Sequence, residues 1–174
     1  MKTSLALVGF MGTGKTAVAK ALARRLNKEF IELDSLIENK AGKSIPAIFQ
    51  QDGEPAFRRL ESEVTRQVAG RKNAVIAGGG GIVLNKINIE YLKKECVIVY
   101  LTASPEIILK RTAGAKNKRP LLEVADRAER IQALLKQRQP LYERAADIKI
   151  DTSGLNINSI AGQIISELKN ESFR

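Results

Sequence analysis

The sequence predicts an α/β fold of three layers, in which a parallel sheet of five strands lies between two layers of helices. Short apolar runs alternate with helical patterns along the chain, and a glycine-rich loop joins the first apolar run to the first helical pattern. The chain has 174 residues, of which 44% are hydrophobic and 28% are charged, as in an ordinary globular domain. We therefore expect a single domain over residues 1–174.

Each element is predicted from its local pattern. The expected strands are short apolar runs at residues 4–8, 30–33, 73–77, 96–101 and 147–150. The expected helices have apolar residues three or four positions apart, at residues 15–26, 35–40, 54–68, 105–111, 123–137 and 156–169. Because parallel sheets bind ligands at the carboxyl ends of their strands, we expect functional residues directly after the strands.

The apolar run at residues 4–8 resembles a signal peptide only faintly. It is short, leads into a glycine loop and is followed by no small-residue cleavage site, so we interpret it as the first strand of a cytoplasmic protein. The single cysteine, Cys96, begins another apolar run. It has no second cysteine for an internal disulfide, and we expect it to be buried and inert.

The net charge of +10 raises the possibility of nucleic-acid binding. The basic residues are dispersed, however, and no basic segment carries the aromatic residues that stack on bases. We expect neither a nucleic-acid nor a membrane partner, and attribute the charge to a solvated surface and a site for polyanionic nucleotides. The chain has no histidine, so proton transfer must use carboxylates, lysine or tyrosine.

Residues 9–16 read Gly-Phe-Met-Gly-Thr-Gly-Lys-Thr and match the pattern of a phosphate-binding loop. The pattern is informative here because an apolar strand precedes it and a helical pattern follows it. Glycines allow backbone N–H groups to converge on an anion at the helix N-terminus. We expect Lys15 to reach the β- and γ-phosphates and the Thr16 hydroxyl to hold Mg²⁺. The alternative is an ordinary turn that contains three glycines and a lysine.

Two acids, Glu32 and Asp34, stand at the end of the second expected strand. In an extended segment, side chains two residues apart point the same way, so we expect both carboxylates at the same site. The alternative for Asp34 is to cap the following helix. No acid stands at a strand end where it would polarise water, which favours transfer to a bound hydroxyl over hydrolysis. Residues 85–88 lack the final aspartate with which GTPases read guanine, so a GTP switch is not expected.

An arginine continues the apolar stripe of a predicted helix. Val124, Ala128, Ile131 and Leu135 follow the spacing of a buried helical face, and Arg138 is the next position on it. Pro140 then ends or kinks the helix. A buried guanidinium needs an anionic partner. The sequence leaves open whether that partner is a structural carboxylate or a substrate.

Three further features are less distinctive. Arg58 has Glu54 and Glu61 four residues before and three after it, so an exposed ion pair on a helix is the default interpretation. The glycines at residues 78–81 allow a ligand to approach the backbone at a strand end, which we favour over a purely structural turn because such a turn rarely needs four glycines. Residues 112–119 lack apolar periodicity and are rich in glycine, alanine and basic residues, which indicates a mobile loop; the alternative is a plain surface connection.

Taken in order, these residues resemble the shikimate kinase family, small P-loop kinases of the nucleoside-monophosphate-kinase-like fold. The resemblance covers nearly the whole chain. The segments that carry it are residues 9–16, residues 30–38, Phe57-Arg58-Arg59-Leu60-Glu61, the glycines at 79–81, Arg119-Pro120-Leu121-Leu122, Arg138-Gln139-Pro140-Leu141-Tyr142 and Ala145-Ala146-Asp147.

The resemblance implies transfer of the γ-phosphoryl group of ATP to the 3-hydroxyl of shikimate, a step of aromatic amino-acid biosynthesis. It implies an acceptor-binding region at about residues 33–61, a lid at about residues 112–122, and catalytic roles for Lys15, Asp34 and Arg119. The implied nucleotide contacts are Gly12, Thr13, Gly14, Lys15, Thr16, Ala17, Arg119 and Arg111, the last stacking on adenine. The implied shikimate contacts are Asp34, Arg58, Gly79, Gly80, Gly81 and Arg138, with Glu61 orienting Arg58, and the implied Mg²⁺ residues are Thr16 and Glu32.

One departure from the family concerns Glu32, where an aspartate is usual; glutamate keeps the charge and adds a methylene. We also consider two other functions. The first is a gluconate or nucleoside-monophosphate kinase of the same fold, although two arginines and an aspartate favour a carboxylated polyol as acceptor. The second is a nucleotide-dependent regulatory or nucleic-acid-binding module. We expect ATP and shikimate as the ligands of a monomer.

Overall fold

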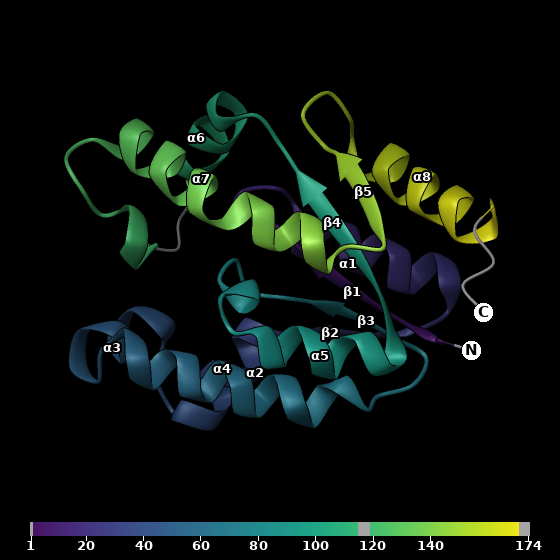
Figure 1. Ribbon diagram of the computed structural model, residues 1–174, viewed down its shortest axis with the longest axis horizontal. Helices are drawn as coiled ribbons and strands as arrows, with labels where there is room; N and C mark the ends of the chain where they lie inside the picture. The colour runs from purple at the N-terminus through teal and green to yellow at the C-terminus, as the bar shows by residue number, and fades with distance from the viewer. Residues whose placement is uncertain (1, 115–118, 171–174) are drawn as a thin grey trace.

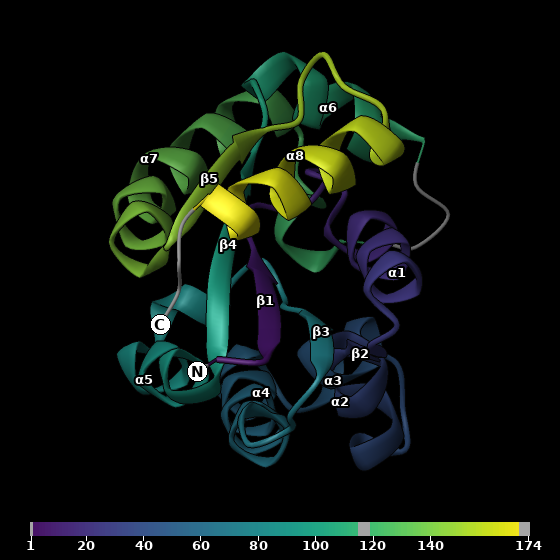
Figure 2. The same ribbon diagram turned by 90° about the vertical axis from the view of Figure 1, so that its right-hand side faces the viewer.

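The computed structural model describes residues 2–114 and 119–170. Its centre is one five-stranded parallel sheet with the strand order β2-β3-β1-β4-β5, which confirms the predicted α/β fold (Figures 1 and 2). The strands are β1 (Ser4–Val8), β2 (Glu29–Glu32), β3 (Ala74–Ala77), β4 (Cys96–Thr102) and β5 (Ile148–Asp151). The middle strand β1 carries the glycine loop at its carboxyl end.

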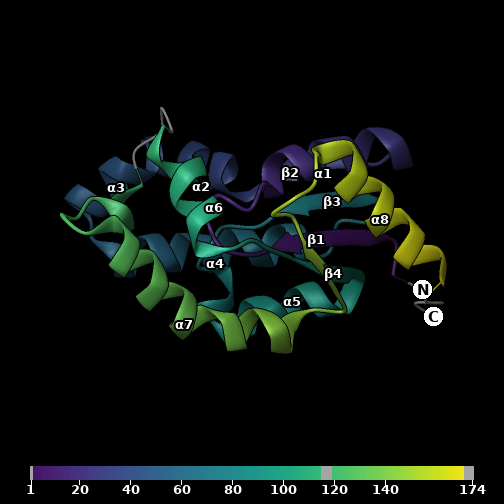
Figure 3. The ribbon, with the colours of Figure 1, turned by 90° about the horizontal axis from the view of Figure 1, so that it is seen from above.

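Helices cover both faces of the sheet, as Figure 3 shows from above. The helices are α1 (Lys15–Leu26), α2 (Leu33–Ala41), α3 (Ile45–Gln51), α4 (Glu54–Ala69), α5 (Lys86–Glu95), α6 (Pro105–Ala113), α7 (Arg127–Ala145) and α8 (Ile157–Asn170), with short 3-10 turns at η1 (Ile82–Leu84) and η2 (Pro120–Leu122). Along β1, Leu5 and Leu7 pack toward α1 and α8, whereas Ala6 and Val8 pack toward α4, α5 and α7. The period-two alternation of a strand therefore divides the core into two layers.

Two helices were absent from the sequence prediction. Helix α3 begins after Ser44, whose hydroxyl accepts a hydrogen bond from the Ala47 N–H, and α5 begins after Asn85, which accepts from the Ile87 N–H. Both cap residues are typical N-terminal signals. The helices are only 7 and 10 residues long, so their apolar periodicity is weak.

The predicted geometry of the two acids is wrong. Strand β2 ends at Glu32 and helix α2 begins at Leu33, so Asp34 lies in the first helical turn rather than in an extended segment. The alternative role for Asp34 is also wrong, because Glu32 is the residue that precedes the helix. An early helix start turns the Asp34 side chain relative to Glu32 and gives the two carboxylates different surroundings.

Helix α7 differs from its prediction at both ends. It begins at Arg127 and continues through Pro140 to Ala145, so Pro140 does not end it. The stripe was predicted too far toward the N-terminus, since Val124 is 46% exposed and Ala128 is also exposed. The buried face begins at Ile131 and includes Leu134, Arg138, Tyr142 and Ala145. Arg138 thus points inward, as predicted.

The burial of Cys96 is confirmed, and burial raises the pKa of its thiol to about 12, which keeps it protonated and unreactive. Within the described parts of the chain, no helix has the combined length and hydrophobicity needed to cross a bilayer.

Candidate active site

The glycine loop ends where α1 begins. Gly14 precedes the helix with a left-handed backbone (φ 91°), a conformation that a residue with a side chain adopts only with strain. The Thr13 side chain is buried and donates to the Phe10 carbonyl at 2.7 Å, so it holds the loop and does not face the cavity. The loop therefore presents the N-terminus of α1 to the space above the sheet, as an anion site requires.

Lys15 spans this loop. Its Nζ donates to the Phe10 carbonyl at 2.8 Å. Loss of hydration lowers the pKa of Lys15 to about 7; the Asp34 carboxylate opposes this change, and the Arg119 and Arg138 guanidinium groups add to it. The side chains of Lys15, Arg119 and Arg138 thus face a common space. Their combined positive potential favours the binding of a polyanion there.

Thr16 and Glu32 lie next to each other, although 16 residues separate them in sequence. The Thr16 hydroxyl donates to Glu32 Oε1 at 2.7 Å, and the Ser35 hydroxyl donates to Glu32 Oε2 at 2.9 Å. Mg²⁺ in such sites takes one or two protein oxygens and fills its remaining positions with phosphate and water. One hydroxyl and one carboxylate beside the phosphate loop therefore fit Mg²⁺, and no cluster of three or more metal-binding side chains occurs in residues 2–114 and 119–170.

Asp34 and Glu61 approach residues 78–81, the glycine turn that follows β3, from different helices. A Cβ added to Gly79 would lie 3.2 Å from Asp34 Oδ1 and 2.9 Å from Glu61 Oε2. The Asp34 side chain opens to the cavity, yet the surrounding protein raises its pKa by limiting hydration, against the attraction of Lys15. A carboxylate with a raised pKa, facing a cavity beside a lysine, is suited to accept a proton from a bound hydroxyl.

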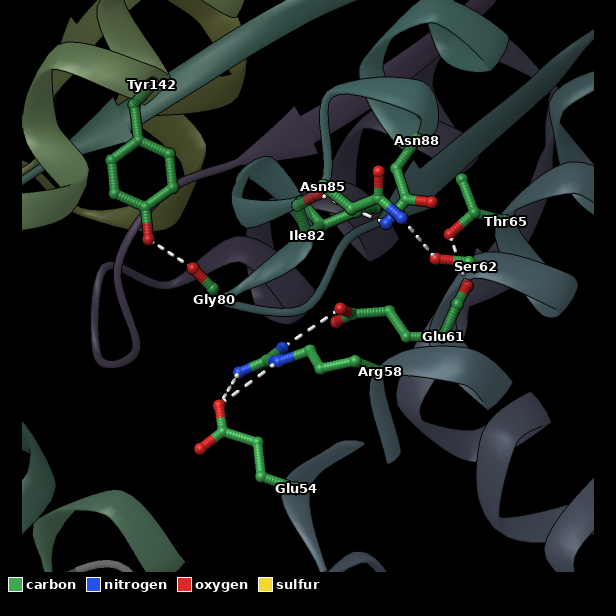
Figure 4. A network of polar contacts seen from close by, with 10 residues as sticks. All are labelled: Glu54, Arg58, Glu61, Ser62, Thr65, Gly80, Ile82, Asn85, Asn88 and Tyr142. Carbon is green, nitrogen blue, oxygen red and sulfur yellow. Dashed lines mark hydrogen bonds and ion pairs between the residues drawn. The ribbon is translucent and has the colours of Figure 1, made fainter. Parts of the chain in front are cut away.

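Arg58 makes both ion pairs predicted for it; the Glu54 side chain is 43% exposed, whereas the Glu61 side chain is buried. Its Nη1 donates to Glu61 Oε1 at 2.9 Å and its Nη2 to Glu54 Oε1 at 3.1 Å (Figure 4). Glu61 is only 1% exposed, and burial raises its pKa while Arg58 opposes the shift. A Cβ at Gly81 would collide with the Arg58 guanidinium. The pair therefore fixes Arg58 against the glycine turn.

Arg138 is the most unusual side chain of the site. It is 2% exposed, and its Nε and Nη1 atoms have no hydrogen-bond partner among the described residues. Its guanidinium carbon lies 5.9 Å from the centre of the Phe10 ring, a favourable contact for a cation. A buried guanidinium with unused donors is costly unless a ligand supplies the anion.

Arg111 and Arg119 complete the cationic surface. Arg111 Nη1 donates to the Gly12 carbonyl at 3.2 Å and its Nη2 to the Thr152 carbonyl at 3.0 Å, which ties it to the loop. Arg119 lies next to η2, and burial lowers its pKa while Asp34 opposes the shift. Of the predicted lid, residues 115–118 lie outside the described residues, whereas α6 extends to Ala113 and η2 begins at Pro120.

These side chains surround one cavity of about 770 Å³. Among the predicted site residues, those lining it are Gly12, Gly14, Lys15, Thr16, Ala17, Glu32, Asp34, Arg58, Gly79, Gly80, Gly81, Arg111, Arg119 and Arg138. Thr13 is the predicted residue that does not line it. The cavity holds a phosphate loop at one end and two arginines with an aspartate at the other, so it can accommodate a nucleotide and a second anionic molecule.

Two features of the cavity were not predicted from the sequence: an apolar wall and a hydrogen bond to the glycine turn. Ile45, Pro46, Phe49 and Phe57 also line the cavity, with the Phe49 and Phe57 rings 4.9 Å apart. No helix was predicted between residues 40 and 54, and the Ser44 cap was the available signal for α3. No local pattern indicated that the Tyr142 hydroxyl donates to the Gly80 carbonyl.

The sheet, the phosphate loop after β1 and the two-ended cavity define a P-loop kinase. The family model for shikimate kinase matches residues 11–169. A shikimate kinase of Pelotomaculum thermopropionicum is 45% identical over 170 residues, with 98% of each chain covered. The chain belongs to the shikimate kinase family and is an ATP-dependent kinase that acts on an alcohol group.

Solved structures also resemble this chain. A shikimate kinase from Acinetobacter baumannii, in complex with shikimate, is 38% identical with a TM-score of 0.95, and the match covers 100% of this chain and 97% of that one. A gluconokinase from Sinorhizobium meliloti is 14% identical with a TM-score of 0.60, covering 98% of this chain and 94% of that one. The second likeness shows a shared fold only.

Proposed function

We propose that this chain transfers the γ-phosphoryl group of ATP to the 3-hydroxyl of shikimate, giving shikimate 3-phosphate and ADP. The observation that carries the acceptor assignment is Arg138, a buried guanidinium with unused donors in the same cavity as Arg58. Guanidinium groups bind carboxylates through paired hydrogen bonds. Two arginines opposite a phosphate loop therefore select a carboxylated alcohol.

The catalytic residues act by position and charge. Lys15 exchanges the Phe10 carbonyl for the β- and γ-phosphates, and Arg119 approaches the transferred group from the segment before η2. Asp34 binds the acceptor hydroxyls and accepts the proton of the 3-hydroxyl. In such transfers, orientation and neutralised charge supply most of the catalysis.

The remaining contacts divide between the two ligands. The backbone of residues 12–17 cradles the phosphates, and Arg111, held by Gly12 and Thr152, offers its planar face to adenine. Arg58 and Arg138 bind the acceptor carboxylate, with Gly79, Gly80 and Gly81 as the wall of that pocket. Thr16 and Glu32 would hold Mg²⁺, which neutralises phosphate charge when bound.

The whole chain would act as one domain and as a cytoplasmic monomer. Its acceptor-binding region is residues 33–61, where α2, α3 and the start of α4 form one wall of the cavity. Its lid is residues 112–122, anchored in the described part by Arg127, whose Nη2 donates to the Thr112 carbonyl at 2.9 Å.

The test is a coupled assay of ADP release with shikimate, gluconate and nucleoside monophosphates as separate acceptors. We expect turnover with shikimate alone. Lys15→Ala is the control, since no other side chain replaces Lys15 over the phosphates and the variant should be inactive with every acceptor. Faster turnover with gluconate or a nucleotide would refute the acceptor assignment.

A further inference from the structure

Tyr142 lies one helical turn after Arg138 on the buried face of α7. Its hydroxyl donates a hydrogen bond to the Gly80 carbonyl, as Figure 4 shows. Its ring stacks on Tyr100 of β4, with the ring centres 5.1 Å apart and an interplanar angle of 22°. Burial raises the pKa of the phenol, which remains a donor throughout the physiological range. The ring and the hydroxyl are therefore both held in place.

Gly80 lies where the phosphate loop meets the acceptor end of the cavity. A Cβ added to it would stand 3.3 Å from the Met11 nitrogen and 3.8 Å from Arg138 Nη1. The Gly80 backbone therefore lies close to both the phosphate loop and Arg138.

The direction of the Gly80 carbonyl also determines where the N–H group of Gly81 points. The chain has no cis peptide in its described residues, so the peptide between Gly80 and Gly81 is planar and trans. A carbonyl held by Tyr142 directs the Gly81 N–H to the opposite side. The N–H groups of Gly79, Gly80 and Gly81 have no acceptor among the described residues, which leaves them free for an anion.

We propose that Tyr142 is a positioning residue for the acceptor: its hydroxyl fixes the Gly80–Gly81 peptide and thereby keeps the glycine turn and Arg138 in the arrangement that binds the carboxylate. This inference rests on the proposed function. Without the hydroxyl, the Gly80 carbonyl loses its donor, and Arg138 Nη1 is a nearby donor without a partner. A guanidinium drawn to that carbonyl is turned away from the acceptor.

The first test is Tyr142→Phe, which removes the hydroxyl and keeps the ring in its stack. Loss of a hydrogen bond to this partly buried carbonyl corresponds to about a tenfold effect. We expect the KM for shikimate to rise about tenfold while kcat and the KM for ATP change less than about twofold, because the lost contact acts in binding. Tyr100→Phe is the matched control, since it removes the hydroxyl of the other ring in the same stack and should leave all three constants nearly unchanged.

A second test separates the hydrogen bond from ring packing. Replacing Tyr142 with 4-aminophenylalanine retains a donor at the same position and should restore the KM for shikimate to within about threefold of the unmodified protein. Failure of this rescue would contradict the proposal, as would equal effects of Tyr142→Phe and Tyr100→Phe. The rescue variant also tests the proposal if Tyr142→Phe does not fold.

A double-mutant cycle tests the link to Arg138. Shikimate binding is measured by calorimetry for Tyr142→Phe, Arg138→Lys and the double variant. We expect the double variant to bind no more than about twofold more weakly than Arg138→Lys, since both changes remove the same arrangement. Effects that multiply would show that Tyr142 acts independently of Arg138. If the unmodified protein neither binds nor phosphorylates shikimate, the proposed function itself is wrong, whatever the variants do.

Discussion

At the scale of single residues, the site works by placing ionisable groups where their charge depends on the ligand. Lys15 is the clearest case, because removal from water lowers its pKa to about 7. A polyphosphate beside Nζ favours the ammonium form and raises this pKa again. Nucleotide binding and proton uptake are therefore linked.

This linkage gives a pH prediction. Above pH 7, Lys15 is mostly neutral before binding and must take up a proton, so the ATP affinity should fall by up to about tenfold per pH unit between pH 7 and 9. Below pH 6, Lys15 is already charged before ATP binds, so the proton uptake on binding should vanish. Calorimetry in buffers of different ionisation enthalpy measures the protons directly. Lys15→Arg is the control, since a guanidinium remains charged throughout this range and should show no uptake above pH 7.

The two acids of the site should have separable roles. Glu32 contacts Thr16, whereas Asp34 faces Gly79 and the acceptor end of the cavity. Glu32→Gln should raise the Mg²⁺ concentration for half-maximal activity about tenfold and leave shikimate affinity nearly unchanged. Asp34→Asn should lower kcat by about 100-fold or more and weaken shikimate binding, with little effect on Mg²⁺ dependence. Separate titrations of Mg²⁺ and of shikimate against both variants test these two roles. If the two variants showed each other's expected behaviour, the roles of Glu32 and Asp34 would have to be exchanged.

At the scale of elements, α7 is the helix that connects the cavity to the sheet, where Tyr142 packs on Tyr100 of β4. Its buried face carries Arg138 into the cavity and Tyr142 to the glycine turn, and the helix continues through Pro140. Pro140 removes a backbone N–H donor, but the helix remains packed by its buried residues on both sides of that position. Local propensity alone therefore gave the wrong helix end, because tertiary packing outweighed it.

The Arg138→Lys substitution tests whether α7 contributes to shikimate binding. Lysine keeps the charge but not the planar fork, so shikimate binding should weaken by about 10- to 100-fold while ATP binding changes little. Arg144→Lys is the control on the same helix, because Arg144 is exposed and donates only to the Pro140 carbonyl among the described residues. Equal losses for shikimate and ATP would mean that Arg138 supports the structure rather than the acceptor.

At the scale of the whole molecule, the parallel sheet brings the ends of distant segments to one edge. Strand β1 lies at its centre, and Leu7 is fully buried between the sheet and the layer formed by α1 and α8. The phosphate loop follows this strand directly. A loss of packing around the central strand would therefore also disturb the geometry of the phosphate loop.

Leu7→Ala should lower the free energy of unfolding by about 2–5 kcal/mol, since it leaves a cavity in the layer between the sheet and the helices. Leu84→Ala provides the comparison, because Leu84 is 37% exposed and its truncation should cost much less. Chemical denaturation of both variants measures the difference. Similar losses would mean that the core around Leu7 relaxes around the missing atoms.

The parts of this protein that are visible in its sequence are those set by neighbouring residues. The phosphate loop at residues 9–16, the five parallel strands and the inward face of Arg138 follow from short-range patterns and were predicted correctly. The expected roles of Lys15 and Thr16 follow from the loop motif itself, whereas those of Arg58, Arg111 and Arg119 came only from the family resemblance.

Tertiary structure decided what depends on residues far apart in the chain. It placed Asp34 in a helical turn instead of a strand, buried Glu61 against Arg58 and the glycine turn, and joined Tyr142 to Gly80 across 62 residues. The physical reason is that strand order and helix crossovers determine which segments meet, and a local pattern carries no information about a partner that the fold brings to it.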